Sequence, residues 1–268
     1  MLKTEMRNEN SMNIDKVDTL SMLNIIQKEN ENAAQAVGMA IDSIAKAVDE
    51  ISARMNNGGR LFYIGCGTSG RLGVLDASEC PPTFGVSSDV VVGVIAGGDK
   101  ALRNAVEKSE DNYEAGKSDL ASYDISEKDS VVGISVAGGA MYVVGALEYA
   151  KSVGALTVAL TCNENTKIAE ICDIEILTDT GAEVITGSSR MKAGTAHKMV
   201  LNMISTSVMV KAGHVYENLM INLKPSNSKL YDRMIRIVCD ITNLSYYEAE
   251  KKLLSNDCNI RKTVDNCK

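Results

Sequence analysis

The stretch from Phe62 to Pro82, FYIGCGTSGRLGVLDASECPP, contains the turn that decides the fold. Gly65, Gly67 and Gly70 stand in the spacing G-x-G-x-x-G directly after an apolar run. That spacing is typical of a turn between a buried strand and a helix, and dinucleotide-binding proteins use it. The stretch therefore predicts a strand, a tight turn and a helix, and it raises the question of which phosphate compound the turn binds.

Similar apolar runs recur along the chain and alternate with segments of helical pattern. They cover residues 60–65, 89–97, 129–139, 155–163 and 173–180. Strands that are apolar throughout are buried on both faces, as in a parallel sheet whose crossovers are helices. The sequence therefore predicts an α/β fold with five parallel strands. In such sheets ligands bind beyond the carboxyl ends of the strands, where the glycine-rich turns lie.

Helical patterns flank the predicted sheet. Apolar positions three and four apart predict two helices over residues 15–57, with a break near residues 29–31. A long apolar helix is predicted over residues 190–212, and the tail beyond residue 225 has the pattern of short helices. We therefore expect three parts: an N-terminal helical arm over residues 1–58, an α/β domain over residues 59–224 and a C-terminal helical subdomain over residues 225–268.

Composition and charge exclude several classes of protein. The chain has 268 residues, a net charge of −7, and no basic stripe of the kind that binds nucleic acid. Its seven cysteines are scattered and it has two histidines, so neither a zinc site nor a disulfide framework is expected. No apolar stretch reaches the length of a membrane span. We expect a cytoplasmic protein without metal or cofactor, bound neither to nucleic acid nor to a membrane.

The residues around the glycines favour a phosphate monoester over a dinucleotide. A dinucleotide site needs an acidic residue at the end of the next strand, and neither Asp89 nor Asp99 is well placed for it. A turn without any ligand is the plainer alternative. Thr68, Ser69 and Arg71, however, put two hydroxyls and a guanidinium at a helix N-terminus, which already favours anions.

A second anion site is expected where the long helix begins, at Gly187, Ser188 and Ser189, with Lys192 one turn further on. The candidate binding residues, all small, hydroxyl-bearing or cationic, are Gly67, Thr68, Ser69, Gly70, Arg71, Gly138, Ser188, Ser189 and Lys192. Together they predict a site for a phosphorylated small molecule.

Three long stretches resemble one enzyme family. They are residues 10–30 (NSMNIDKVDTLSMLNIIQKEN), 65–85 (GCGTSGRLGVLDASECPPTFG) and 187–206 (GSSRMKAGTAHKMVLNMIST). These stretches resemble the N-acetylmuramic acid 6-phosphate etherases, members of the sugar isomerase (SIS) domain superfamily and relatives of the glucokinase regulatory protein. The resemblance implies a homodimer with a three-layer α/β/α sandwich and a flavodoxin-like sheet. It also implies cleavage of a D-lactyl ether without metal or cofactor, in cell-wall recycling.

The resemblance assigns two catalytic carboxylates. Glu79 matches the proton donor to the leaving ether oxygen, and Glu110 matches the second catalytic glutamate, the base at C2. The chemistry requires such a pair, because the C2 proton is acidified by the open-chain aldehyde and the departing lactate needs a proton. From the sequence pattern alone, without the resemblance, both glutamates would be interpreted as solvated surface residues.

The sequence departs from the family in a second loop, over residues 136–142. The family has Ala-Ser-Gly-Arg-Thr-Pro-Tyr there, whereas this chain has Val-Ala-Gly-Gly-Ala-Met-Tyr, without the hydroxyls or the guanidinium. The C-terminal helical bundle is also expected to lack its last helices. An alternative function is therefore a weak or inactive relative that binds a sugar phosphate as a regulator.

Overall fold

The computed structural model describes residues 1–106, 108–225 and 227–267. The chain divides into two compact units. The first unit comprises residues 1–78 and 89–208, and the second comprises residues 79–88 and 209–268. Each unit is described by itself.

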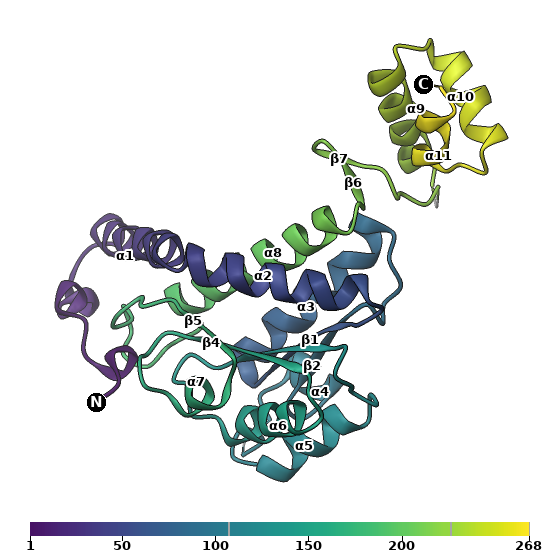
Figure 1. Ribbon diagram of the computed structural model, residues 1–268. Helices are drawn as coiled ribbons and strands as arrows, with labels where there is room; N and C mark the ends of the chain where they lie inside the picture. Colours follow the sequence, from purple (N-terminus) through teal and green to yellow (C-terminus); the bar gives the residue numbers. More distant parts are fainter. Residues whose placement is uncertain (107, 226, 268) are drawn as a thin grey trace. The chain divides into compact units, whose positions relative to one another are not determined.

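A parallel sheet of five strands forms the centre of the first unit (Figure 1). The strands are β1 (Leu61–Gly65), β2 (Val91–Ile95), β3 (Ser130–Ile134), β4 (Leu156–Thr161) and β5 (Ile174–Leu177). Their order in the sheet is β2-β1-β3-β4-β5, and every neighbouring pair is parallel. The predicted α/β fold with a flavodoxin-like sheet is confirmed. The strand order reverses between β1 and β3, where such sheets bind their ligands.

Helices cover both faces of this sheet. They are α1 (Thr19–Met39), α2 (Ile41–Asn56), α3 (Gly67–Phe84), α4 (Asp99–Arg103), α5 (Tyr113–Ala121), α6 (Met141–Ser152), α7 (Lys167–Ile171) and α8 (Lys192–Lys211). Figure 1 shows α2, α3 and α8 on one face of the sheet, and α5, α6 and α7 on the other. The three layers follow from strands that are buried on both sides.

Alternate residues of β1 supply the two halves of the core. Phe62 and Ile64 pack in one apolar cluster with Val143 and Leu147 of α6, and all four side chains are fully buried. Tyr63 points to the opposite face, where its hydroxyl donates to the backbone carbonyl of Leu201 in α8 at 3.4 Å. Because successive side chains of a strand point to opposite faces, β1 packs against both helical layers. This strand leads directly into the glycine turn.

One expected helix boundary is wrong. The break in the N-terminal helices falls at Ala40, not near residues 29–31, because α1 packs through that region and buries Glu29. Helix α3 continues through Pro81 and Pro82 to Phe84. The prolines lie in its last turn, and Gly85, with φ +68°, accepts the left-handed conformation that ends the helix.

The segment between β2 and β3 contains less helix than its pattern predicts. Helix α4 has only five residues, and α5 begins at Tyr113 after its cap Asn112. A connection of several residues therefore separates the two helices, and of these Glu107 lies outside the described residues. The intervening residues carry Glu110, which matters for the site.

The N-terminal segment packs on the first unit as three short 3-10 helices. Thr4 exchanges hydrogen bonds with Asn163, Asn8 donates to the carbonyl of Ala182, and Ser11 donates to that of Val184. Polar side chains therefore fix the N-terminal segment to the first unit.

The second unit has its own apolar core. Its elements are β6 (Val215–Tyr216), β7 (Leu219–Met220), α9 (Ser228–Thr242), α10 (Tyr246–Ser255) and α11 (Ile260–Asp265). The hairpin of β6 and β7 was not expected, since two strands of two residues leave no periodic pattern. A capping box of Ser245 and Glu248 opens α10, and Leu253 of that helix is fully buried.

Candidate functional site

A cavity of about 420 Å³ lies where the strand order reverses, at the carboxyl ends of β1 and β3. The described residues that line it are 66–69, 110–111, 134–137, 139–140 and 189. They come from the turns after β1 and β3, the loop before α5 and the loop before α8. Of the predicted site residues, Gly67, Thr68, Ser69, Glu110 and Ser189 are brought together here.

The three glycines of the opening stretch have separate physical roles. A Cβ on Gly65 would lie 2.8 Å from the backbone nitrogen of Gly70, and a Cβ on Gly70 would lie 2.5 Å from the carbonyl oxygen of Gly65. Strand and helix therefore touch backbone to backbone. Gly67 has φ +52°, which turns the chain from β1 into α3. As a result the first turn of α3 points its free N–H groups at the cavity, with the side chains of Thr68 and Ser69.

Glu110 is held at the cavity by its backbone. The N–H of Tyr142, in the first turn of α6, donates to the carbonyl of Glu110 at 2.9 Å. Helices α5 and α6 cross at close range, because Cβ atoms on Gly116 and Gly145 would collide with the carbonyls of Tyr142 and Tyr113. This packing fixes the loop that carries Glu110 beside the start of α3.

The turn after β3 supplies hydrogen-bonding groups despite its apolar composition. Its Ser135 hydroxyl accepts from the N–H of Gly138 at 3.1 Å, and Ser135 lines the cavity. Gly138 has φ +68°, and a Cβ there would lie 2.3 Å from that of Thr166. Gly138 therefore shapes the turn and is not among the cavity-lining residues. Sequence reasoning missed Ser135, although its place at a strand end was a usable signal.

Cys66 also lines the cavity, as a neutral thiol. Burial raises its pKa to about 12, and the nearby carboxylates of Glu110 and Asp111 act in the same direction. A nucleophilic cysteine needs a lowered pKa. Among the candidate groups at this site, the carboxylates are therefore the ones suited to proton transfer.

A buried carboxylate organises the start of α8. Glu183 is fully buried, and its two carboxylate oxygens accept from the N–H groups of Lys192 and Ala193 at 3.3 and 3.0 Å. Burial raises the pKa of Glu183 despite these bonds. Between Glu183 and the helix start that it caps stands the loop of Gly187 to Ser189, whose last residue lines the cavity.

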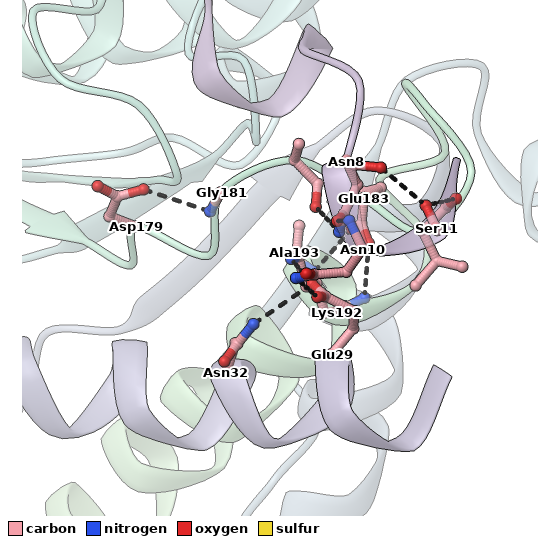
Figure 2. A network of polar contacts seen from close by, with 12 residues as sticks. Asn8, Asn10, Ser11, Glu29, Asn32, Asp179, Gly181, Glu183, Lys192 and Ala193 are labelled. Atoms are coloured by element: carbon pink, nitrogen blue, oxygen red, sulfur yellow. Dashed lines mark hydrogen bonds and ion pairs between the residues drawn. The ribbon is translucent and has the colours of Figure 1, made fainter. Parts of the chain in front are cut away.

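Lys192 is engaged in a buried ion pair, away from the cavity lining (Figure 2). Its ammonium lies 2.5 Å from Oε2 of Glu29, and both side chains are 3% exposed. Asn10 donates to the same carboxylate at 2.9 Å, and Asn32 donates to it at 3.3 Å. Although burial raises the pKa of Glu29, hydrogen bonds from Lys192, Asn10 and Asn8 bring it below its usual range. The ion pair joins the N-terminal segment, α1 and α8.

The other predicted site residues do not line the cavity described above. Arg71 donates through Nε and Nη2 to the carbonyls of Leu102 and Asn104, at 3.1 and 3.2 Å, and so holds the loop that follows α4. Ser188 makes the turn into α8, where its carbonyl accepts from Met191. Glu79 lies on α3 in the second unit, with an exposed side chain.

No three His, Cys, Asp or Glu side chains among the described residues are grouped as a metal site. None of the helices in that part of the chain is long and apolar enough to cross a bilayer.

Three family models match the chain. The N-terminal SIS domain of glucokinase regulatory protein matches residues 43–151, and the SIS domain matches residues 103–210. The C-terminal lid domain of glucokinase regulatory protein matches residues 217–266. Two of these models thus cover the sheet and its cavity, and the third covers the helices of the second unit.

Curated relatives match nearly the whole chain. An N-acetylmuramic acid 6-phosphate etherase of Caldanaerobacter subterraneus subsp. tengcongensis is 53% identical over 263 residues, which is 98% of this chain and 86% of the relative. One from Bacillus pumilus is 52% identical, over 98% of this chain and 87% of the relative.

Solved structures share the fold at low identity. An E. coli CFT073 protein in complex with a sugar phosphate has a TM-score of 0.53 at 19% identity, and it covers 74% of this chain and 95% of its own. A phosphoheptose isomerase from Francisella tularensis has a TM-score of 0.52 at 19% identity, over 70% and 98% of the two chains.

Proposed function

The chain belongs to the family of N-acetylmuramic acid 6-phosphate etherases, and from this membership and the cavity we propose that it is an enzyme that cleaves the D-lactyl ether of N-acetylmuramic acid 6-phosphate. The products are N-acetylglucosamine 6-phosphate and D-lactate, in amino-sugar recycling. The observation that carries the proposal is the meeting of Glu110 with the N-terminus of α3 in one cavity.

The 6-phosphate binds at the first turn of α3. The free N–H groups of that turn and the hydroxyls of Thr68, Ser69 and Ser189 offer donors to its oxygens. Binding of a sugar phosphate agrees with the structural relative from E. coli CFT073, which was solved in complex with such a compound. No Lys or Arg occurs among the described residues that line this cavity, so neutral donors and the helix dipole compensate the charge.

Ether cleavage proceeds by elimination and then addition of water. In the open-chain sugar the aldehyde at C1 acidifies the proton on C2, and Glu110 removes it. The electron pair forms the C2–C3 double bond while the C3–O bond breaks. Glu79 gives the leaving lactate its proton; this role rests on the resemblance of residues 65–85. Water then adds, with hydroxyl at C3 and a proton at C2. Acid and base contribute about 10²–10⁴-fold each.

The test is release of D-lactate from N-acetylmuramic acid 6-phosphate by the purified protein. Glu110→Gln and Glu79→Gln keep side-chain size and remove the titrating group, so each is expected to lower the rate by about 100-fold or more. Asp15→Asn, an exposed carboxylate in the N-terminal segment, is the matched control and keeps full activity. Full activity in both glutamine variants contradicts the mechanism.

One observation favours a second function, binding of a sugar phosphate without turnover. The turn after β3 brings Val136, Ala137, Gly139 and Ala140 to the cavity, with neither cation nor hydroxyl among them. A protein of this kind would hold N-acetylglucosamine 6-phosphate tightly and release no lactate. The same assay, with binding of that product measured beside it, separates the two functions.

The proposal also includes the oligomeric state of the protein and its cellular compartment. Leu20 and Leu23, one turn apart near the start of α1, are 70% and 56% exposed, and this apolar pair suits association of two copies as a homodimer. The described cysteines are free thiols, which suits the cytoplasm. Sedimentation of the protein and of a Leu20→Glu, Leu23→Glu variant tests the dimer, because the variant is expected to sediment as a monomer.

A further inference from the structure

A second, smaller cavity adjoins the proposed phosphate site. It has a volume of about 240 Å³ and shares Cys66, Gly67 and Glu110 with the larger cavity. The two cavities differ in charge. The described lining of the smaller one includes the cations Arg71 and Lys108, whereas that of the larger one includes none. Glu110 thus lies between a site of neutral donors and a cationic site.

Lys108 is the cation available to a ligand in the smaller cavity. Arg71 already donates to two backbone carbonyls. Lys108 is exposed, and within the described ranges 1–106, 108–225 and 227–267 its ammonium has neither a hydrogen bond nor an ion pair. Its backbone has φ +63°, a conformation that is costly for a residue other than glycine and that clusters at binding sites.

Apart from Ser109, whose hydroxyl donates to the carbonyl of Val106, the remaining wall of the smaller cavity is made of small apolar side chains. It includes Ala96, Ala101, Ala105 and Val106. Val106 packs against Gly97, where an added Cβ would lie 3.2 Å from the valine side chain. A cation beside a small apolar wall suits a short carboxylate that carries a methyl group.

The substrate of the proposed reaction carries such a group. Its lactyl ether on C3 ends in a carboxylate and bears one methyl, while its phosphate is on C6. Glu110 acts at C2, next to the ether carbon. Since the two cavities share Glu110, a substrate with its phosphate at the start of α3 and its C2 at Glu110 can place the lactyl group in the smaller cavity.

We propose that the smaller cavity is the subsite for the lactyl group, in which Lys108 binds the carboxylate and the wall of Ala101, Ala105 and Val106 receives the methyl. This inference rests on the proposed function. It makes Lys108 a specificity residue that distinguishes the substrate from its product, because the product retains the phosphate but has lost the lactyl group.

The test compares two ligands that differ only in that group. Dissociation constants for N-acetylmuramic acid 6-phosphate and N-acetylglucosamine 6-phosphate are measured by calorimetry, in a Glu110→Gln background so that the first ligand is not consumed. Lys108→Met is expected to weaken the lactyl-bearing ligand about 10- to 100-fold, as for the loss of one charged hydrogen bond, and to leave the other within about twofold. Lys108→Arg keeps the preference.

Lys100→Met is the matched control, because Lys100 is an exposed lysine of α4 that does not line the smaller cavity. It is expected to change neither constant. If Lys108→Met weakens the binding of both ligands equally, Lys108 binds the phosphate. If it changes neither dissociation constant, Lys108 has no role in binding. Either outcome overturns the proposal. If the unmodified protein releases no D-lactate while the preference still depends on Lys108, the proposed function fails and the subsite stands.

Discussion

At the scale of single residues, the site depends on what side chains are absent as much as on those present. Gly65 and Gly70 bring the end of β1 against the start of α3, and nothing larger fits between them. Gly139 is different, because an added Cβ there meets no atom within 4 Å although the residue lines the cavity. The first two glycines are required by packing, whereas Gly139 leaves room that a side chain can fill.

Gly139→Arg is therefore expected to be tolerated and to strengthen phosphate binding. The guanidinium would add charged hydrogen bonds to a cavity whose described lining has no cation, a gain of about 1.5–3 kcal/mol, or roughly 10- to 100-fold in the dissociation constant of N-acetylglucosamine 6-phosphate. Gly139→Gln, which adds length without charge, is the control. If Gly139→Gln strengthens binding as much as Gly139→Arg does, the gain does not come from the positive charge.

His197 predicts how stability depends on pH. It is fully buried in α8 with Nε2 3.3 Å from the sulfur of Cys162, and burial lowers its pKa to about 4. The unfolded chain protonates this histidine near its ordinary pKa of 6.5, so below that pH protons favour unfolding. The resulting loss of stability develops as the pH falls from about 6.5 toward 4 and is complete below the folded pKa.

Urea unfolding at two pH values measures this contribution. From about pH 7.5 to pH 5 the histidine is expected to cost the native protein about 2 kcal/mol, at 1.36 kcal/mol per pKa unit. His197→Gln removes the titrating group, so its free energy of unfolding should fall less over the same interval by that amount. If both proteins lose the same free energy of unfolding over this interval, His197 is not the group responsible.

At the scale of elements, the sequence predicts the sheet well and the site in part. The five strands were predictable because each is a continuous apolar run, and the first glycine turn marked the cavity. The role of Lys192 was not predictable, since its partner Glu29 stands 163 positions earlier and no periodicity connects them. Lys108 was missed for a related reason, because only the fold brings its loop beside the turn after β1.

The pair of Glu29 and Lys192 is expected to stabilise the junction of α1 and α8. Lys192→Met leaves a buried carboxylate without its cation, which typically costs about 3–5 kcal/mol in the free energy of unfolding. The double variant Glu29→Gln, Lys192→Met removes both charges and should recover much of that loss. Urea unfolding of the two single variants and the double variant gives the coupling energy, and additive losses would exclude a direct interaction.

At the scale of the whole molecule, each of the two units has an apolar core of its own. In the first unit buried side chains pack on both faces of the sheet, and in the second they come from the hairpin of β6 and β7 with α9, α10 and α11. The family models divide along similar lines, with the lid model confined to residues 217–266. A defect in one core is therefore expected to act first on its own unit.

Leu253→Ala tests this division. The side chain is fully buried in the core of the second unit, so the truncation is expected to cost about 2–5 kcal/mol there. Hydrogen exchange reports each unit separately, and faster exchange should be confined to the amides of α9, α10 and α11. Leu254→Ala, at the exposed neighbouring leucine, is the control. Equal acceleration in the strands of the sheet would show that the two units unfold as one.

The pairing of Glu29 with Lys192 also imposes an order on biosynthesis. The ribosome adds 163 residues after Glu29 to reach Lys192, which takes on the order of 10–30 s at typical elongation rates. During that interval Glu29 remains in water, and the N-terminal segment has neither Ala182 nor Val184 to accept its hydrogen bonds. The earliest part of the nascent chain is thus among the last to reach its final place, and the cavity acquires Ser189 only when α8 has emerged.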